Sequence, residues 1–245
     1  MNSFYLTLHS HGDSHVKTKN DVHDFNIHLG KTLRLPGQWE VGLAQIFYPM
    51  AIQPVRKPYN LMQIAFNGKV NDISLGSNTF TSKGLCAVLT LAFRYYDIEM
   101  SQVGGWLQFK NGNDIEYKVT MHPTLQNILG VPQNFTLSGN KNLNFYGDLD
   151  VNRGVPRELY VHTDLVDYQM VNTGFERLLR IVPNDTSHYK FGCSSNQTFE
   201  RIQYMRVAKD VVDSVNVYIK DSDGVAIPFA YGTLTVVLHF RQIDG

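Results

Sequence analysis

The chain has 245 residues, of which 43% are hydrophobic and 12% aromatic. This composition excludes a largely disordered chain, and the length is enough for one large domain, or one domain with an insertion, to bury a core without disulfides or metals. The 22 basic residues balance the 22 acidic ones, so the chain lacks the basic excess that grips nucleic-acid phosphates. We therefore expect no direct sequence-specific nucleic-acid binding.

The two cysteines and the N-terminus indicate where the chain is made. Cys86 and Cys193 lie far apart and lack the spacing of a metal or redox motif, so we expect two free thiols in a chain made in the cytoplasm or nucleus of a cell. The first residues lack the apolar core of a signal peptide. No apolar run approaches the ~20 residues that a transmembrane helix needs, so we expect no membrane span.

Apolar and polar residues alternate along the N-terminal part of the chain. Alternation with a period of two indicates strands that bury one face. A polar stretch, residues 9–20, separates the first strand from the second and is predicted to be a loop. The predicted strands span residues 4–8, 22–29 and 37–46.

The middle of the chain has a different pattern. Apolar residues at helical spacing predict a helix over residues 82–96, for which Thr81 or Ser82 is a suitable N-cap. A second, short helix is predicted to begin at Pro123 and end at Gly130. Between them we predict a hairpin of residues 105–109 and 115–119.

Strong alternation returns in the C-terminal third, over residues 159–165, 178–182, 215–219 and 233–240. Asp and Gly within 220–224 supply turn chemistry. Many short strands without strand–helix alternation favour a sandwich or jelly roll over a parallel α/β sheet. We predict an all-β fold: a jelly-roll domain of residues 1–59 and 156–245, with an α+β insertion subdomain of residues 60–155.

Histidines crowd the first loop, at His9, His11 and His15. A His-x-His pair can supply two metal ligands, and a metal-dependent jelly-roll enzyme using His9 and His11 is one hypothesis. The neighbouring Ser10, Gly12 and Asp13 are instead typical of a solvated turn, and the glycine spacing of metal-binding cupins is absent. We therefore predict a polar surface loop and no metal site.

Other patterns give little support for catalysis. No Gly-x-Ser-x-Gly elbow occurs, although Cys193 with His188 is a conceivable nucleophile–base pair. Residues 221–224 resemble the start of a calcium loop, but the Glu that should end it is missing, which favours a β-turn. We predict no catalytic residue and no cofactor.

A modest basic cluster surrounds Tyr204 and consists of Arg201, Arg206 and Lys209. Basic and aromatic residues together can bind single-stranded nucleic acid. Acidic residues interleave with these, so a solvated or interfacial face is the preferred interpretation. Since tyrosine, tryptophan and arginine are enriched where protein surfaces meet, the tyrosine-rich composition points toward assembly.

Several stretches, taken in order and spacing, resemble the penton (minor capsid) proteins of Polinton/Maverick elements, adintoviruses and virophages. In its first loop the chain departs from this family, which has a serine- and asparagine-rich run where this chain has histidines. The stretches that carry the resemblance are residues 3–8, 25–29, 33–46, 79–82, 127–130, 158–166, 178–183, 217–221 and 236–241.

The resemblance implies a single jelly roll of two four-stranded antiparallel sheets, in which N-terminal strands pair near residues 233–240 and the insertion points outward. It implies a homopentamer at the five-fold vertex of an icosahedral double-stranded DNA virus or virus-like particle, in contact with a double-jelly-roll major capsid protein. The protein would then be part of the virion. On this basis we predict Tyr48, Tyr168 and Tyr204 as interface residues. The alternative is a carbohydrate- or receptor-binding jelly roll, such as a spike module, in which the insertion binds a host receptor.

Overall fold

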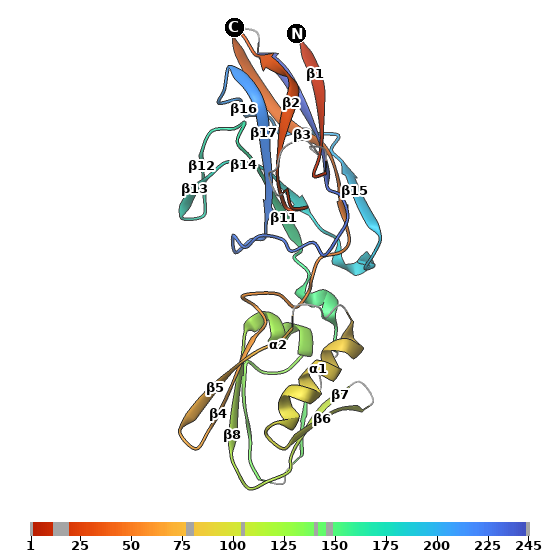
Figure 1. The fold of residues 1–245 in the computed structure, drawn as a ribbon, viewed down its shortest axis with the longest axis vertical. Helices are drawn as coiled ribbons and strands as arrows, with labels where there is room; N and C mark the ends of the chain where they lie inside the picture. The colour runs from red at the N-terminus through yellow and green to blue at the C-terminus, as the bar shows by residue number, and fades with distance from the viewer. Residues whose placement is uncertain are drawn as a thin grey trace. The chain divides into compact units, whose positions relative to one another are not determined.

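The computed structural model describes residues 2–11, 20–76, 81–103, 106–139, 142–145 and 149–243. The chain divides into two compact units, one of Met1–Ile52 with Pro156–Gly245 and the other of Gln53–Val155. The first division falls seven residues before the boundary that we expected, because Val55 and Tyr59 already lie buried in the second unit, Val55 within its hydrophobic core. Figure 1 shows the fold.

The first unit is a sandwich of two antiparallel sheets. Sheet A has the strand order β1-β18-β3-β15, with β16 also paired to β3, and sheet B has the order β14-β11-β17-β2. A separate two-stranded hairpin pairs β12 with β13. The strands are β1 (Ser3–His9), β2 (Asp24–Arg34), β3 (Gln38–Pro49), β11 (Glu158–Thr163), β12 (Gln169–Val171), β13 (Gly174–Glu176), β14 (Leu178–Pro183), β15 (Ser194–Thr198), β16 (Met205–Arg206), β17 (Val211–Lys220) and β18 (Thr235–Ile243), and a short 3-10 helix, η2, covers Thr186–His188.

The chain passes back and forth between the two sheets: β1 lies in sheet A, β2 in B, β3 in A, β11 and β14 in B, β15 in A, β17 in B and β18 in A. This wrapping of eight strands into two stacked sheets is a jelly roll. The pairing of N-terminal strands near residues 233–240 is confirmed, since Leu6 lies opposite Leu238 and Leu238 lies opposite Leu43. The predicted all-β jelly-roll fold is confirmed.

The alternation of apolar and polar residues along each strand explains which side chains form the core of the sandwich. Along β18, Val236, Leu238 and Phe240 have no exposed surface, while the residues between them are half-buried. Along β17, Val215 and Val217 are buried in the same way. Each strand therefore contributes every second side chain to the interior, as the sequence pattern predicts.

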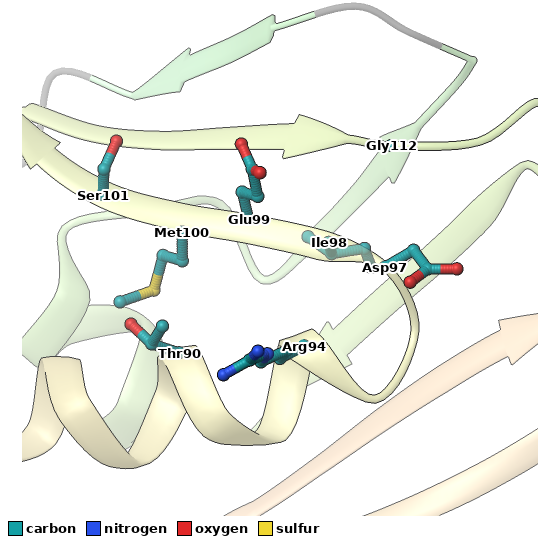
Figure 2. Close-up of a pocket in the computed structure, with 8 residues that line it drawn as sticks. All are labelled: Thr90, Arg94, Asp97, Ile98, Glu99, Met100, Ser101 and Gly112. Carbon is teal, nitrogen blue, oxygen red and sulfur yellow. The ribbon is translucent and has the colours of Figure 1, made fainter.

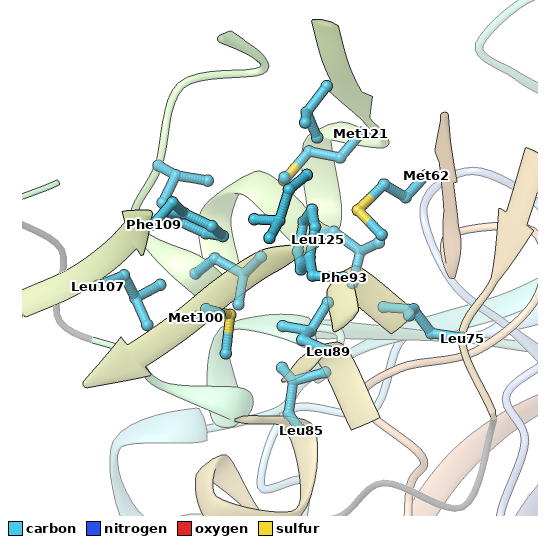
Figure 3. Packing of buried hydrophobic residues seen from close by; sticks show 14 of the residues in the cluster. Met62, Leu75, Leu85, Leu89, Phe93, Met100, Leu107, Phe109, Met121 and Leu125 are labelled. Atoms are coloured by element: carbon cyan, nitrogen blue, oxygen red, sulfur yellow. The ribbon is translucent and has the colours of Figure 1, made fainter. Parts of the chain in front are cut away.

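The second unit is built from two smaller sheets and two helices. Its sheets have the orders β5-β4-β8-β9 and β10-β7-β6. Figure 3 shows how residues from both sheets and both helices share one core, in which Phe93 and Phe109 lie 5.3 Å apart between ring centroids. The elements are β4 (Leu61–Phe66), β5 (Lys69–Ser74), α1 (Ser82–Arg94), β6 (Ile98–Val103), β7 (Trp106–Asn111), β8 (Tyr117–Met121), α2 (Pro123–Leu129), β9 (Asn134–Leu137), β10 (Asn142–Phe145) and the 3-10 helix η1 (Val151–Gly154).

Both predicted helices are present with the expected caps. The Thr81 hydroxyl accepts a hydrogen bond from the Gly84 N–H (3.0 Å) at the start of α1. Gly130 ends α2 in the left-handed conformation, with a φ of 64°, which glycine adopts without a steric penalty. Neither of the two helices that the described ranges contain has the length and apolar character of a membrane-spanning helix.

The predicted hairpin of residues 105–109 and 115–119 is wrong in its pairing. Both strands exist, but β7 pairs with β6 and β10, whereas β8 pairs with β4 and β9. The turn residues between them form an asparagine-stabilised loop instead, in which the Asn111 side chain donates to the Ile115 carbonyl (2.6 Å). Each of the two strands thus joins a different sheet of the second unit.

Candidate assembly surfaces

Tyr48 is a core residue, which corrects its prediction as an interface residue. Only 1% of its surface is exposed, and its hydroxyl donates to the Asn184 side-chain oxygen over 3.0 Å. Asn184 is also buried, and its amide donates to the Pro156 carbonyl (2.7 Å). Because the ring and the hydroxyl of Tyr48 both lie inside the sandwich, almost none of its surface is available for contact with a neighbouring chain.

Tyr168 and Tyr204 lie on two different surfaces of the first unit. Tyr168 is 62% exposed and stacks under the Arg177 guanidinium, whose carbon lies 4.7 Å from the ring centroid. Tyr204 is half-buried, and its hydroxyl lies 2.6 Å from His239 Nδ1. The Arg241 guanidinium covers the Tyr204 ring at 3.7 Å. The interface role of both tyrosines stays a prediction.

A chain segment, residues 199–204, crosses the outer face of sheet A. It passes over Gly42, where a Cβ atom would lie 2.4 Å from Ile202 Cγ2 and 2.5 Å from the Gln203 carbonyl oxygen. Glycine is therefore required for this close approach. The Tyr204–His239 contact fastens the end of the segment to β18.

Beside this segment the outer face of sheet A stays open and forms a notch. Its volume is 320 Å³. Tyr5 stands at its side with 64% of its surface exposed and its ring centroid 4.5 Å from that of His239. We call this the outer-face notch; it is lined by Tyr5, Ala44, Gln45, Thr198, Phe199, Ile202 and Val237.

The β12–β13 hairpin is a second surface, on sheet B. Met170 on β12 lies directly opposite Phe175 on β13, and the two side chains are 73% and 68% exposed. Sequence analysis missed this hairpin, although the run Val171-Asn172-Thr173-Gly174 is a turn signal between short apolar segments. Asn172 adopts a left-handed φ of 53°, which asparagine tolerates.

The base of the hairpin is held to sheet B by charged and polar groups. Glu176 Oε2 lies 2.6 Å from His162 Nε2 and 3.7 Å from the Lys220 ammonium. His162 is fully buried and stacks on Tyr218, with 4.7 Å between ring centroids. Burial lowers the pKa of His162, and the Glu176 carboxylate offsets this only in part.

The second unit has a groove of its own between α1 and β6, shown in Figure 2. Its volume is 840 Å³. Thr90 and Arg94 of α1 form one wall, and Met100 of β6 points toward the helix from the other. The remaining lining residues are Asp97, Ile98, Glu99, Ser101 and Gly112.

The strand β6 is a sheet edge beside this groove, since among the described strands it pairs with β7 alone. The Gly112 N–H donates to the Asp97 carbonyl (2.9 Å), and the register continues as Ile98↔Asn111. Because antiparallel pairs alternate between bonded and non-bonded, the backbone of Glu99 bonds to β7. The backbone groups of Ile98, Met100 and Gln102 therefore point to the free edge, where an extended peptide can pair.

Among the comparisons with known proteins, only solved structures match this chain. No family model matches the chain, and no curated protein matches it. Among solved structures, the mavirus penton protein matches with a TM-score of 0.57 at 8% identity, over 99% of this chain and 100% of that one. The chain has the fold of the mavirus penton protein. A chain of the Sputnik virophage structure matches with a TM-score of 0.50 at 10% identity, over 99% and 98%.

The expected resemblance to virophage penton proteins is therefore confirmed at the level of the fold. It extends over the insertion as well as the jelly roll, because both chains are covered almost completely. Because the identity is low, this likeness shows the fold and assigns no role to individual residues.

Part of the histidine loop, including His15, lies outside the described residues. His9 Nδ1 lies 2.8 Å from the Thr235 hydroxyl, and His11 Nδ1 lies 3.1 Å from the Ser10 hydroxyl. Both rings thus contact hydroxyl groups. In the described part of the chain, no group of three or more His, Cys, Asp or Glu side chains is arranged to hold a metal ion.

The other residues that the sequence suggested as functional candidates make contacts within the fold. His188 pairs with Asp185 (2.8 Å). Asp221 forms the predicted turn, since its carboxylate accepts from the backbone N–H groups of Asp223 (3.0 Å) and Val225 (2.9 Å). In the basic cluster, Lys209 is bound to Asp164 at 2.5 Å.

Proposed function

We propose that this chain is a structural, non-enzymatic capsid vertex protein, five copies of which ring each five-fold vertex of an icosahedral double-stranded DNA virus or virus-like particle. The observation that carries the proposal is the fold likeness to the mavirus penton protein over the whole chain, insertion included. On this proposal the protein is located in the virion after synthesis in the host cell, and it contacts a double-jelly-roll major capsid protein.

The surfaces of the first unit support assembly into a closed ring. A ring with cyclic symmetry is built from heterologous contacts, so each subunit needs two different surfaces. The first unit carries a hairpin with exposed apolar side chains beside sheet B and a notch of mixed apolar and polar lining on sheet A. Contiguous exposed apolar groups on a soluble domain mark interaction sites.

Native mass spectrometry of the purified chain tests the proposal, together with co-expression with a double-jelly-roll major capsid protein. We expect an assembly of five chains in solution, or incorporation at the vertices of the co-expressed particles as seen by electron microscopy. A chain that stays monomeric at high concentration and is absent from the particles would contradict it.

The groove between α1 and β6 favours a second candidate function, receptor binding by the insertion. Arg94, Asp97 and Glu99 line the groove with charges of both signs, and the edge of β6 that does not face β7 offers its backbone groups to a ligand. Binding of the purified chain to host cells or to a glycan array, reduced by Arg94→Glu but not by Val70→Asp on the exposed edge strand β5, would support it. Equal binding by both variants would count against it.

A further inference from the structure

The β12–β13 hairpin has exposed apolar side chains that none of the described elements of its own chain covers. Met170, Phe175 and Tyr168 are between 62% and 73% exposed, and the two strands pair with no third strand among those described. A two-stranded hairpin alone is only marginally stable in water. An opposed methionine–phenylalanine pair that is mostly exposed is explained if another surface covers it in the assembled state.

The hairpin is also held in place before any partner arrives. The Glu176 carboxylate binds His162 and Lys220 at its base, and the Gln169 amide donates to the Leu178 carbonyl. The backbone N–H of Thr163 donates to the Arg177 carbonyl (3.1 Å). A pre-organised element loses little conformational entropy on docking, so its apolar contacts contribute more to affinity.

We propose that the hairpin of one subunit docks into the outer-face notch of a second copy of this chain. The inference rests on the ring assembly proposed above and names its contact. The notch offers Tyr5, Phe199 and Ile202 as apolar walls, with Gln45 and Thr198 as polar groups beside them. Its 320 Å³ accommodates a few side chains rather than a whole domain face, which matches the small size of the hairpin.

The position of the two surfaces favours a ring over a two-fold pair. The hairpin extends from the ends of β11 and β14 in sheet B, whereas the notch lies on the outer face of sheet A, which is the other layer of the same sandwich. In Figure 1 the hairpin is on the left of this unit, and β1 and β15 are on the right. A two-fold contact of hairpin with hairpin would leave the notch empty, whereas a head-to-tail contact fills it.

The hairpin contact is the centre of the interface and not the whole of it. Stable interfaces bury about 800 Å² on each partner, and a few central residues supply most of the binding energy. We therefore expect substitutions at Met170 and Phe175 to have large effects. The double variant Met170→Asp with Phe175→Asp should weaken association by at least about 30-fold. At a concentration where both chains are monomeric, its thermal unfolding should match that of the wild type.

Cysteine cross-linking tests the contact directly. In a Cys86→Ser, Cys193→Ser background, Thr173→Cys places a thiol at the hairpin tip and Thr198→Cys places one beside the notch. The two substitutions are made in separate chains that carry tags of different mass. The two chains are then mixed and mildly oxidised. We expect mixed disulfide dimers of the two chains, and a chain with both substitutions should give a covalent ladder that ends at five.

The matched control replaces Thr198→Cys by Val70→Cys, a site in the second unit that is also exposed, and should give no mixed dimer. Dimers of the Thr173→Cys chain with itself as the main product would overturn the head-to-tail contact. Five-fold rings without the mixed dimer, and rings that persist in the Met170→Asp, Phe175→Asp variant, would overturn this inference and leave the proposed function intact. Wild-type chains that form neither rings nor particles would overturn both.

Discussion

His162 couples the stability of the first unit to pH. Its ring is fully buried between Tyr218 and the Glu176 carboxylate, and burial lowers its pKa below 6.5. The folded chain therefore binds the proton on this ring less readily than the unfolded chain does. Stability from this group is fully present above pH 6.5 and is lost as the pH falls from 6.5 toward the folded pKa.

We expect the free energy of unfolding to fall as the pH drops below 6.5, with at most about 1.4 kcal/mol per pH unit from this one ring. His162→Gln removes the titrating group, so its free energy of unfolding should depend less on pH. Urea denaturation between about pH 5.5 and 7.5 measures both. An unchanged pH dependence in His162→Gln would contradict the assignment.

Tyr48 is a core tyrosine and Tyr168 is a surface tyrosine, so loss of the hydroxyl should affect stability differently at the two positions. Tyr48→Phe leaves the buried Asn184 oxygen without its donor, so the free energy of unfolding should fall by about 1–2 kcal/mol. Tyr168→Phe removes a hydroxyl from an exposed ring and should change stability by less than about 0.5 kcal/mol. Denaturant unfolding measures the difference. Loss of assembly in Tyr48→Phe at unchanged stability would show that Tyr48 is an interface residue after all.

At the scale of elements, the segment of residues 199–204 depends on glycine in β3. A Cβ at position 42 collides with Ile202 and with the Gln203 carbonyl, and overpacking of this kind costs about 1–3 kcal/mol. Gly42→Ala should therefore lower the melting temperature and move the segment away from sheet A.

Gly30→Ala is the matched control for this substitution. Gly30 also lies in a strand, β2, but a Cβ there meets no atom within 4 Å. Its melting temperature should equal or slightly exceed that of the wild type, since alanine has the smaller backbone entropy in the unfolded chain. Equal melting temperatures for Gly42→Ala and Gly30→Ala would contradict the close approach.

At the scale of the whole molecule, both proposed assembly surfaces belong to the jelly-roll unit. Phe109 is fully buried in the other unit, and Phe109→Ala should destabilise that unit by about 3–5 kcal/mol. We expect limited proteolysis to cut within residues 53–155 more readily, while the native mass of the assembly stays that of the wild type. Leu91→Ala, at a 68% exposed position in the same unit, is the control; loss of assembly in Phe109→Ala alone would place a ring contact in the insertion.

The sequence by itself determined the local elements of this protein. Alternation along residues 4–8, 37–46 and 233–240 predicted strands, and helical spacing with suitable caps predicted α1 and α2, because both periodicities follow from the backbone geometry of each element. The order of these elements was enough for the all-β class, and the family resemblance pointed to the jelly roll.

Apart from the pairing of N-terminal strands near residues 233–240, which the family resemblance predicted, only the tertiary structure decided which segments meet. Alternation shows which side chains share a face of a strand, but it does not show what covers that face or which strand lies beside it. Tyr48 was therefore assigned to the surface although Asn184 holds it in the core, and β7 was paired with β8 although its partners are β6 and β10. For the same reason the exposed pair on the β12–β13 hairpin and the notch on sheet A became visible only once distant parts of the chain, such as Ala44 and Phe199, were brought together.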